Sequence, residues 1–141
     1  MNERGVMGFD FGTKRLGVAV GQELTRTASP LITLDVKNGL PDWHALATLI
    51  QQWRPEIFVV GLPQHQDGKP HALAPLIADF CARLQSQYQR PVYTVDERLS
   101  SYAAESELKE RGLDPRRHKK QIDALAASII LQNWLEDQTN L

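Results

Sequence analysis

The sequence lacks most of the features that would place it in a specialised class of protein. A single cysteine, Cys81, excludes an internal disulfide framework. No apolar run reaches the roughly 18 residues that a membrane span needs, and no signal-peptide pattern opens the chain. The net charge is only −1, so a nucleic-acid partner would have to be held by a local basic patch. We therefore expect a cytoplasmic protein without a membrane partner.

The composition is that of an ordinary globular protein. The 141 residues are 42% hydrophobic and 23% charged, which argues against a disordered chain. No internal repeat, low-complexity tract or linker interrupts the sequence. We expect one domain over residues 1–141, built around a single core.

The hydrophobic pattern predicts strands that later alternate with helices. The first three strands have short connections and can pair as an antiparallel meander, whereas the later strands should lie parallel. This order predicts an α/β protein with a mixed sheet flanked by helices, as in ribonuclease H-like folds. Asp42 is the expected N-cap of the first helix, and the three tryptophans fall on helical stripes expected in the core. The predicted strands are 6–11, 16–21, 28–36, 56–61 and 91–95, and the predicted helices are 41–53, 71–88, about 101–111 and 121–136.

Three acidic residues stand out by their surroundings. Asp10 lies in an apolar strand, where a buried carboxylate is costly unless a hydrogen bond, a cation or a metal compensates it. Glu97 follows the last predicted strand directly, and Asp123 lies in the first turns of the last helix. Sites in open α/β sheets gather at the carboxyl ends of strands, so Asp10 and Glu97 can meet there. The alanines after Asp123 would let its helix approach the sheet closely.

Three converging carboxylates repel one another, and divalent cations resolve that repulsion. Mg²⁺ prefers a few carboxylate oxygens and keeps several of its waters. Two such ions about 3.5–4 Å apart stabilise the attacking and leaving oxygens when a phosphodiester is cleaved. The pattern therefore predicts a two-metal site for Mg²⁺ (or Mn²⁺) at Asp10, Glu97 and Asp123, and a hydrolytic reaction.

Each acid also has a purely structural interpretation. Asp10 can cap the turn that follows it, and Asp123 near a helix N-terminus is favourable through the helix dipole alone. Asp96 and Glu97 would point to opposite faces of a strand. We take Glu97 as the inward carboxylate, although the pattern alone does not decide between the two.

Basic residues flank all three acids. A charge run is usually a solvated face, but phosphate-backbone binding beside a metal site needs cations in this arrangement. We expect a nucleic-acid-binding surface formed by Lys14, Arg98, Arg116, Arg117, Lys119 and Lys120.

Four sequence motifs follow one another along almost the whole chain: "FDFGTKRLGVAVG", "VVGLP" with a following "DG", "DERLSS" and "KKQIDALAASIILQNWL". They resemble those of the YqgF (RuvX) family. The resemblance implies a ribonuclease H-like fold related to the RuvC Holliday-junction resolvases. It also implies a nuclease that matures the 5′ end of pre-16S rRNA in ribosome biogenesis, or one that resolves Holliday junctions. The family's acidic positions fall on Asp10, Glu97 and Asp123. At His65 members often carry Asn, which leaves the role of His65 open.

Two other classes stay open at the level of the sequence. The stretch around Asp10 also resembles the first phosphate motif of the actin, Hsp70 and sugar-kinase ATPases, which close two such domains over the nucleotide. A noncatalytic RNA-binding assembly factor would use the same basic surface. The sequence does not decide between precursor rRNA and branched DNA as substrate, nor between a monomer and a homodimer. A junction resolvase would need two active sites related by a two-fold axis.

Overall fold

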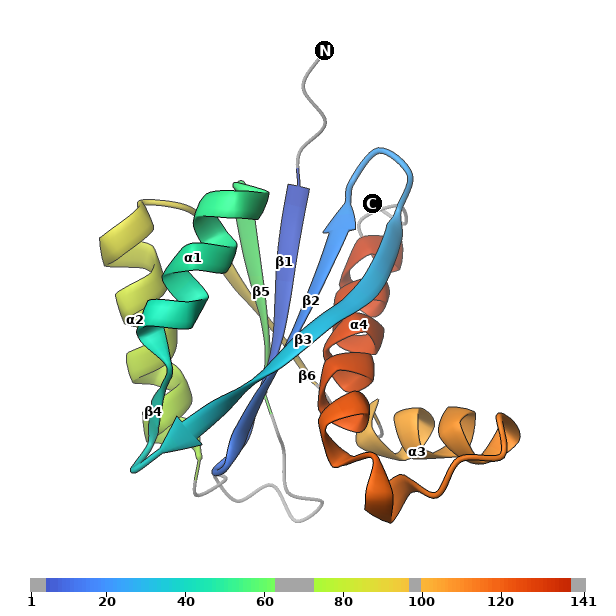
Figure 1. Ribbon diagram of the computed structural model, residues 1–141. Coiled ribbons are helices and arrows are strands. Elements are labelled where there is room, and N and C mark those ends of the chain that lie inside the picture. The colour runs from blue at the N-terminus through green and yellow to red at the C-terminus, as the bar shows by residue number, and fades with distance from the viewer. Residues whose placement is uncertain (1–4, 63–72, 97–99, 138–141) are drawn as a thin grey trace.

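The computed structural model describes residues 5–62, 73–96 and 100–137. Within them, strands and helices alternate as the sequence predicts (Figure 1). The elements in chain order are β1 (Gly5–Phe11), β2 (Arg15–Gln22), β3 (Thr27–Lys37), β4 (Leu40–Pro41), α1 (Trp43–Trp53), β5 (Ile57–Leu62), α2 (Ala74–Tyr88), β6 (Val92–Asp96), α3 (Ser100–Glu110), the 3-10 turn η1 (Pro115–Arg117) and α4 (Lys119–Asp137).

The described strands form one mixed sheet in the order β4-β3-β2-β1-β5-β6. The first three strands form the predicted antiparallel meander, and β5 and β6 lie parallel to β1. The sequence did not predict β4, which pairs only with Val36 and Lys37 at the end of β3. It also placed the start of the last helix at 121, whereas α4 begins at Lys119 and takes in part of the basic stretch.

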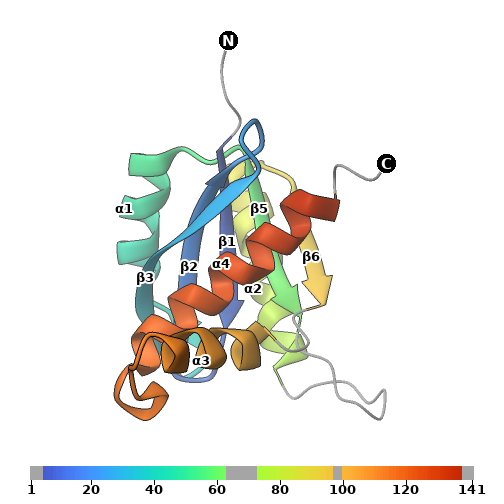
Figure 2. The same ribbon diagram turned by 90° about the vertical axis from the view of Figure 1, so that its right-hand side faces the viewer.

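Helices cover both faces of the sheet (Figures 1 and 2). On one face, α1 and α2 bury a cluster that includes Met7, Phe9 and Phe11 of β1. On the other face, α4 crosses the strands and packs Ile130 and Leu131 into a second cluster. Helix α3 packs against α4 rather than against the sheet. Burial on both faces explains why the sequences of β1 and β5 are nearly continuous apolar runs.

Two helix ends match the capping residues predicted from the sequence. The side chain of Asp42 accepts a hydrogen bond from the backbone N–H of Ala45 at the start of α1. Gly112 ends α3 in the left-handed region, with φ of 78°, and the next N–H, from Leu113, bonds back to the carbonyl of Leu108. This is the usual arrangement of a glycine-terminated helix.

The prediction that all three tryptophans lie in the core is wrong for Trp53. Trp134 is buried, but Trp53 is 48% exposed. It is the last residue of α1, and the chain turns away at Arg54 with φ of 47°. A helical stripe indicates which side of a helix faces the sheet, but not where the sheet beneath it ends. In the described part of the chain, no helix combines the length and apolar character needed to cross a membrane.

Candidate active site

Asp10 lies near the carboxyl end of β1 and belongs to the face that α4 covers. Side chains alternate along a strand, and Phe9 and Phe11 on either side of Asp10 pack into the cluster under α1 and α2. Val6, four residues earlier, packs with α4. Asp10 is therefore the polar end of an otherwise apolar row on the α4 face, where it is half-buried. The turn-cap interpretation does not require this placement, but a site under α4 does.

Gly17 brings Asp123 to the same place. Asp10 lies opposite Gly17 in the antiparallel pairing of β1 and β2, and opposite residues share a face of the sheet. A Cβ atom built on Gly17 would lie 1.9 Å from the backbone carbonyl oxygen of Asp123. Only glycine leaves room for α4 at this point. The two predicted carboxylates, far apart in the sequence, are thus brought to one end of one sheet face.

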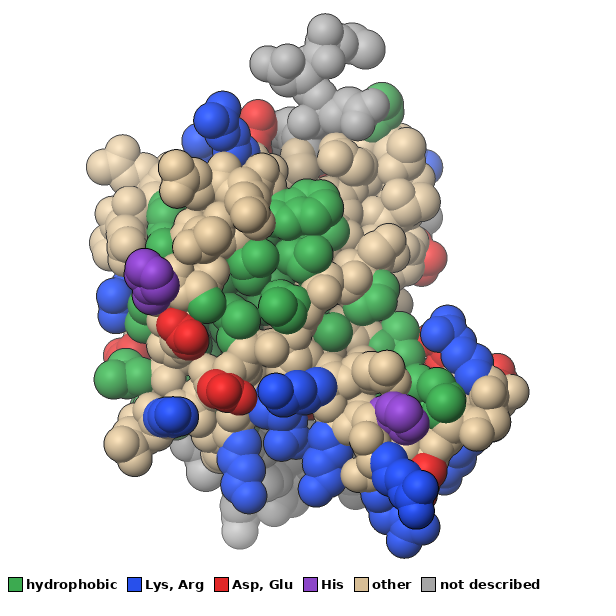
Figure 3. Space-filling model, viewed as in Figure 1, with side chains coloured by type: hydrophobic (Ala, Val, Ile, Leu, Met, Phe, Trp, Pro, Cys, Tyr) green, Lys and Arg blue, Asp and Glu red, His purple; other side chains and the backbone are tan. Residues whose placement is uncertain are grey.

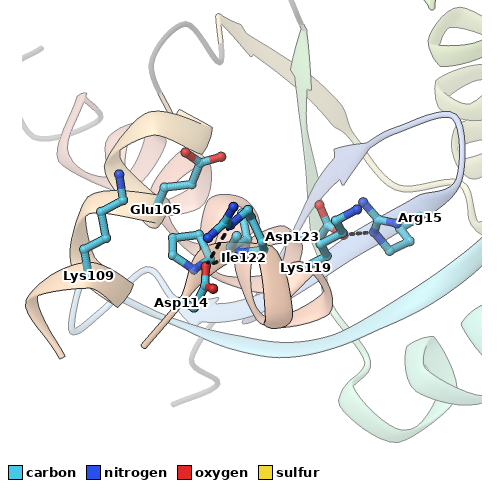
Figure 4. A pocket seen from close by; sticks show the side chains of 9 residues that line it. Arg15, Glu105, Lys109, Asp114, Lys119, Ile122 and Asp123 are labelled. Carbon is cyan, nitrogen blue, oxygen red and sulfur yellow. Dashed lines mark hydrogen bonds and ion pairs between the residues drawn. The ribbon is translucent and has the colours of Figure 1, made fainter. Parts of the chain in front are cut away.

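The carboxylate of Asp123 is paired with a cation from β2. The Nε–H of Arg15 donates a hydrogen bond to the Asp123 carboxylate, and the two groups form an ion pair (Figure 4). The Asp123 side chain is 21% exposed. Burial raises the pKa of the Asp123 carboxyl above its ordinary value, and the hydrogen bond and the charge of Arg15 oppose this effect without cancelling it. The site therefore holds a carboxylate whose negative charge is incompletely compensated.

Removing the charge of Asp123 should not weaken the metal-free fold. Because its folded pKa is raised above the ordinary 3.8, stability falls as the pH rises from about 3.8 through the raised value. The Asp123→Asn variant has no carboxyl group to ionise, so it does not lose this stability as the pH rises. In thermal melts at pH 7 with chelator, we expect it to unfold at the same temperature as the wild type or higher, with the difference shrinking at about pH 3.5.

Asp114→Asn is the matched control for this prediction. The backbone N–H of Arg116 lowers the pKa of Asp114, so this carboxylate contributes stability above its ordinary pKa and its loss should lower the melting temperature slightly at pH 7. A clear drop for Asp123→Asn would instead mean that the charge of Asp123 stabilises the fold, through its ion pair with Arg15 or through the helix dipole.

A pocket of about 530 Å³ opens beside the Asp123–Arg15 pair (Figure 4). It lies between α3, η1 and the start of α4, and its lining contains both acids and bases. Asp114 accepts hydrogen bonds from the backbone and side chain of Arg116 at its rim. The lining residues include Arg15, Glu105, Lys109, Asp114, Arg116, Lys119 and Asp123.

The predicted basic residues before Asp123 form a continuous surface next to this pocket. Arg116, Arg117, Lys119 and Lys120 are all exposed and line a shallow groove of about 460 Å³ together with Arg15. Lysine and arginine side chains gather along the corresponding lower margin of the molecule in Figure 3. Lys14 is also exposed, in the turn between β1 and β2. We call Arg116, Arg117, Lys119 and Lys120 the basic surface below.

The remaining predicted residues are not brought into the site by the described structure. Glu97, Arg98 and His65 lie outside the described residues. Asp96, the alternative to Glu97, is exposed at the end of β6. Because its neighbour Val95 packs with the cluster under α4, strand alternation places Asp96 on the opposite face from Asp10. Among the described side chains, no group of three His, Cys, Asp or Glu residues is close enough to hold a metal.

In the sequence, Arg15 is only one of the basic residues beside Asp10, and nothing there pairs it with Asp123 or assigns a role to Glu105 or Lys109. Arg15 is two residues from Gly17 on the same strand, so alternation with Asp10 as reference would have placed it on the α4 face. Glu105 and Lys109 are one turn apart on α3 and line the pocket. No signal in the sequence distinguishes them from an ordinary exposed helical pair, since their position depends on how α3 docks on α4.

Comparison with solved structures identifies the class of fold. The RuvC protein of T. thermophilus, solved in complex with a Holliday junction substrate, aligns over 97% of this chain and 96% of its own, with a TM-score of 0.59 and 19% identity. The Fowlpox virus resolvase, solved with Holliday junction DNA, aligns over 95% and 98%, with a TM-score of 0.59 and 10% identity. The fold is thus the ribonuclease H-like fold of the RuvC-type resolvases, as predicted.

Comparison of sequences identifies the family. The model of the RuvX family, described as Holliday junction resolvase, matches residues 4–137. A protein of Pseudomonas fluorescens (strain SBW25) named "Putative pre-16S rRNA nuclease" is 43% identical over 96% of this chain and 94% of its own length. A protein of Pseudomonas paraeruginosa with the same name is 42% identical over the same shares. This chain belongs to the RuvX family, which confirms the predicted resemblance.

Proposed function

We propose that this protein is a metal-dependent endonuclease that hydrolyses phosphodiester bonds in structured nucleic acid. We further propose that its substrate is precursor rRNA, cleaved at the 5′ end of pre-16S rRNA in the cytoplasm. The observation that supports this most is the placement of Asp10 and Asp123 at one end of the α4 face, beside the basic surface. The names of the relatives support the choice of substrate.

The residues at this end of the sheet suit a hard divalent cation. Carboxylate oxygens are the ligands that Mg²⁺ prefers. The half-buried carboxylate of Asp123 already forms an ion pair with one cation, the guanidinium of Arg15. Asp10 and Asp123 would hold Mg²⁺ or Mn²⁺, with Glu97 as the third carboxylate, the role that the family resemblance gives it. The ions, when bound, supply the positive charge that stabilises the attacking and leaving oxygens of the cleaved phosphodiester.

The cations around the acids would position the substrate. Arg15, Arg116 and Lys119 line the pocket that contains Asp123, so a phosphate bound there lies within reach of the carboxylates. Lysine and arginine contacts to phosphates fix the register of a nucleic acid without reading its sequence. Lys14 and Arg98 are proposed to extend the same surface. The chain would thus recognise the backbone and shape of its substrate.

The basic surface should determine the salt dependence of binding. Replacing Lys119 and Lys120 by Gln should weaken binding to RNA of any sequence. It should also reduce the slope of log K against log salt by about two, because each lysine that neutralises a phosphate adds roughly one to that slope. Fluorescence anisotropy with a labelled RNA at several salt concentrations, in chelator, measures both quantities.

In the matched control variant, two exposed arginines away from the site, Arg26 and Arg90, are replaced by Gln. Arg26 lies in the turn between β2 and β3, and Arg90 lies just before β6. The Arg26→Gln, Arg90→Gln variant should keep the wild-type slope. If both double variants show the same slope of log K against log salt, the basic surface does not bind phosphates and is an ordinary solvated face.

A Holliday junction is the second candidate substrate, because the family model is described by that activity and two proteins of the same fold were solved with such junctions. Cleaving a junction symmetrically takes two active sites related by a two-fold axis. Sedimentation of the protein with and without a four-way junction therefore separates the two candidates. A strict monomer in both conditions favours rRNA.

A further inference from the structure

A second pocket, of about 610 Å³, lies against the outer side of β3. It is bounded by residues 30–33 of β3, by the end of α3 and by the first turns of α4. Its walls are mainly apolar, with Leu108, Leu113 and Leu125 among the lining residues. The volume falls in the range of roughly 300–1,000 Å³ typical of ligand pockets.

This pocket is continuous with the basic surface. Lys120 and Gln121 line both the basic groove and the apolar pocket, and the apolar pocket includes Ala124, the residue after Asp123. Arg111 lines the pocket as well, with its guanidinium paired with Glu107 one turn earlier on α3. A nucleic-acid strand that follows the basic surface around the start of α4 therefore passes the opening of an apolar pocket that Lys120 borders.

The β3 side of the pocket offers hydrogen-bonding groups as well as apolar surface. Among the described strands, β3 pairs with β2 on one side and, on the other, with β4 at Val36 and Lys37 only. The stretch 30–33 is thus part of a sheet edge, where those backbone groups of Leu31, Ile32 and Thr33 that do not pair with β2 can bond a ligand. Apolar walls with a few fixed polar groups suit a flat, partly polar ring.

We propose that this pocket binds one unpaired nucleobase of the substrate, with an adjoining phosphate against Lys120. The proposal rests on the proposed nuclease function and adds a substrate class to it: structured nucleic acid with an unpaired nucleotide near the cleaved bond. A base in a continuous duplex is stacked and paired, so it cannot enter the pocket unless it is first extruded. A bulged or single-stranded base enters without that cost.

Binding to bulged RNA tests the proposal in chelator, where no cleavage occurs. Three RNA duplexes are compared by anisotropy: one with a single-nucleotide bulge, one whose bulged nucleotide is abasic, and one fully paired. The wild type should bind the bulged duplex about tenfold more tightly than the abasic one, because the base covers apolar pocket surface that is otherwise in contact with water. The abasic and paired duplexes should bind alike, through phosphates alone.

Substitutions at the pocket complete the experiment. Leu125→Glu, at a half-buried side chain that lines the pocket from α4, should remove the preference for the intact bulge while keeping the affinity for the paired duplex within about threefold, since one added charge acts weakly across water. Leu24→Glu makes the same change at a side chain that is 62% exposed in the turn between β2 and β3, and it should behave like the wild type.

Three results would overturn the proposal. If wild-type protein binds the bulged and abasic duplexes equally, the pocket does not hold a base, although phosphate binding stands. If it binds no RNA and no DNA, the proposed nuclease function fails and the base site fails with it. If Leu125→Glu converts a sedimenting dimer into a monomer, the pocket is an interface between copies.

Discussion

Replacing Asp10 by Asn is expected to reduce nucleic-acid cleavage by about a thousandfold or more, because charge stabilisation by a bound metal contributes several kcal/mol to the transition state. The amide keeps the shape of the side chain but is a much weaker ligand for Mg²⁺. The loss should appear in the rate of the chemical step, measured in single-turnover reactions with enzyme in excess over a labelled RNA. Binding of the same RNA in chelator should stay within a few-fold of the wild type.

Two further variants make this prediction specific. Asp79→Asn makes the same change at an exposed position of α2 and should cleave normally. The double variant Asp10→Asn, Asp123→Asn should be little worse than either single variant, because residues that act as one unit are strongly non-additive. If the Asp10→Asn variant cleaves at the wild-type rate, Asp10 is a turn cap, and the assignment of Asp10 and Asp123 to a metal site is wrong.

Gly17→Ala is expected to cause the largest loss of stability among conservative substitutions at this site. The new methyl group would lie 1.9 Å from the carbonyl oxygen of Asp123, so α4 must move away from β2. Overpacking typically costs about 1–3 kcal/mol, and the upper end applies here because the clash is with backbone. We expect the melting temperature to fall by roughly 5–10 °C, and cleavage to fall further than the unfolded fraction explains, because Asp123 moves relative to Asp10.

Gly5→Ala is the control for this effect. A Cβ atom at Gly5, at the start of β1, would meet its nearest neighbour at 3.9 Å, an ordinary contact. Its melting temperature and cleavage rate should stay close to those of the wild type. Equal melting temperatures for Gly17→Ala and the wild type would mean that α4 does not depend on this close approach, and the positioning of Asp123 would need another explanation.

Much of the fold could be predicted from the sequence because its elements carry strong local signals. The apolar runs around Asp10 and in β5, the helical spacing of α1 and the glycine after α3 each depend on short-range chemistry. The two-residue strand β4 carries no such signal. Trp53 shows the limit of periodicity, since its exposure depends on where α1 ends relative to the sheet.

The site could be predicted only in part. Asp10 and Asp123 stood out because a carboxylate in an apolar strand and one among alanines both need an explanation, and the structure brings them to one face. The pairing of Arg15 with Asp123 joins residues 108 positions apart and follows only from the docking of α4 at Gly17. Glu97 remains a prediction from the sequence. The apolar pocket beside β3 is formed by three separate segments, and no single segment signals it.

We propose that this RuvX-family protein cleaves nucleic acid at a divalent metal held by Asp10 and Asp123, with precursor rRNA as its substrate. The most direct test incubates purified protein with precursor 16S rRNA and with a four-way DNA junction, in Mg²⁺, in Mn²⁺ and in chelator, and maps the products. We expect cleavage at the 5′ precursor segment of the rRNA with either metal, none in chelator, and none by Asp10→Asn or Asp123→Asn. RNA that is bound but left intact under all three conditions, or cleaved equally by the wild type and both variants, would contradict the claim.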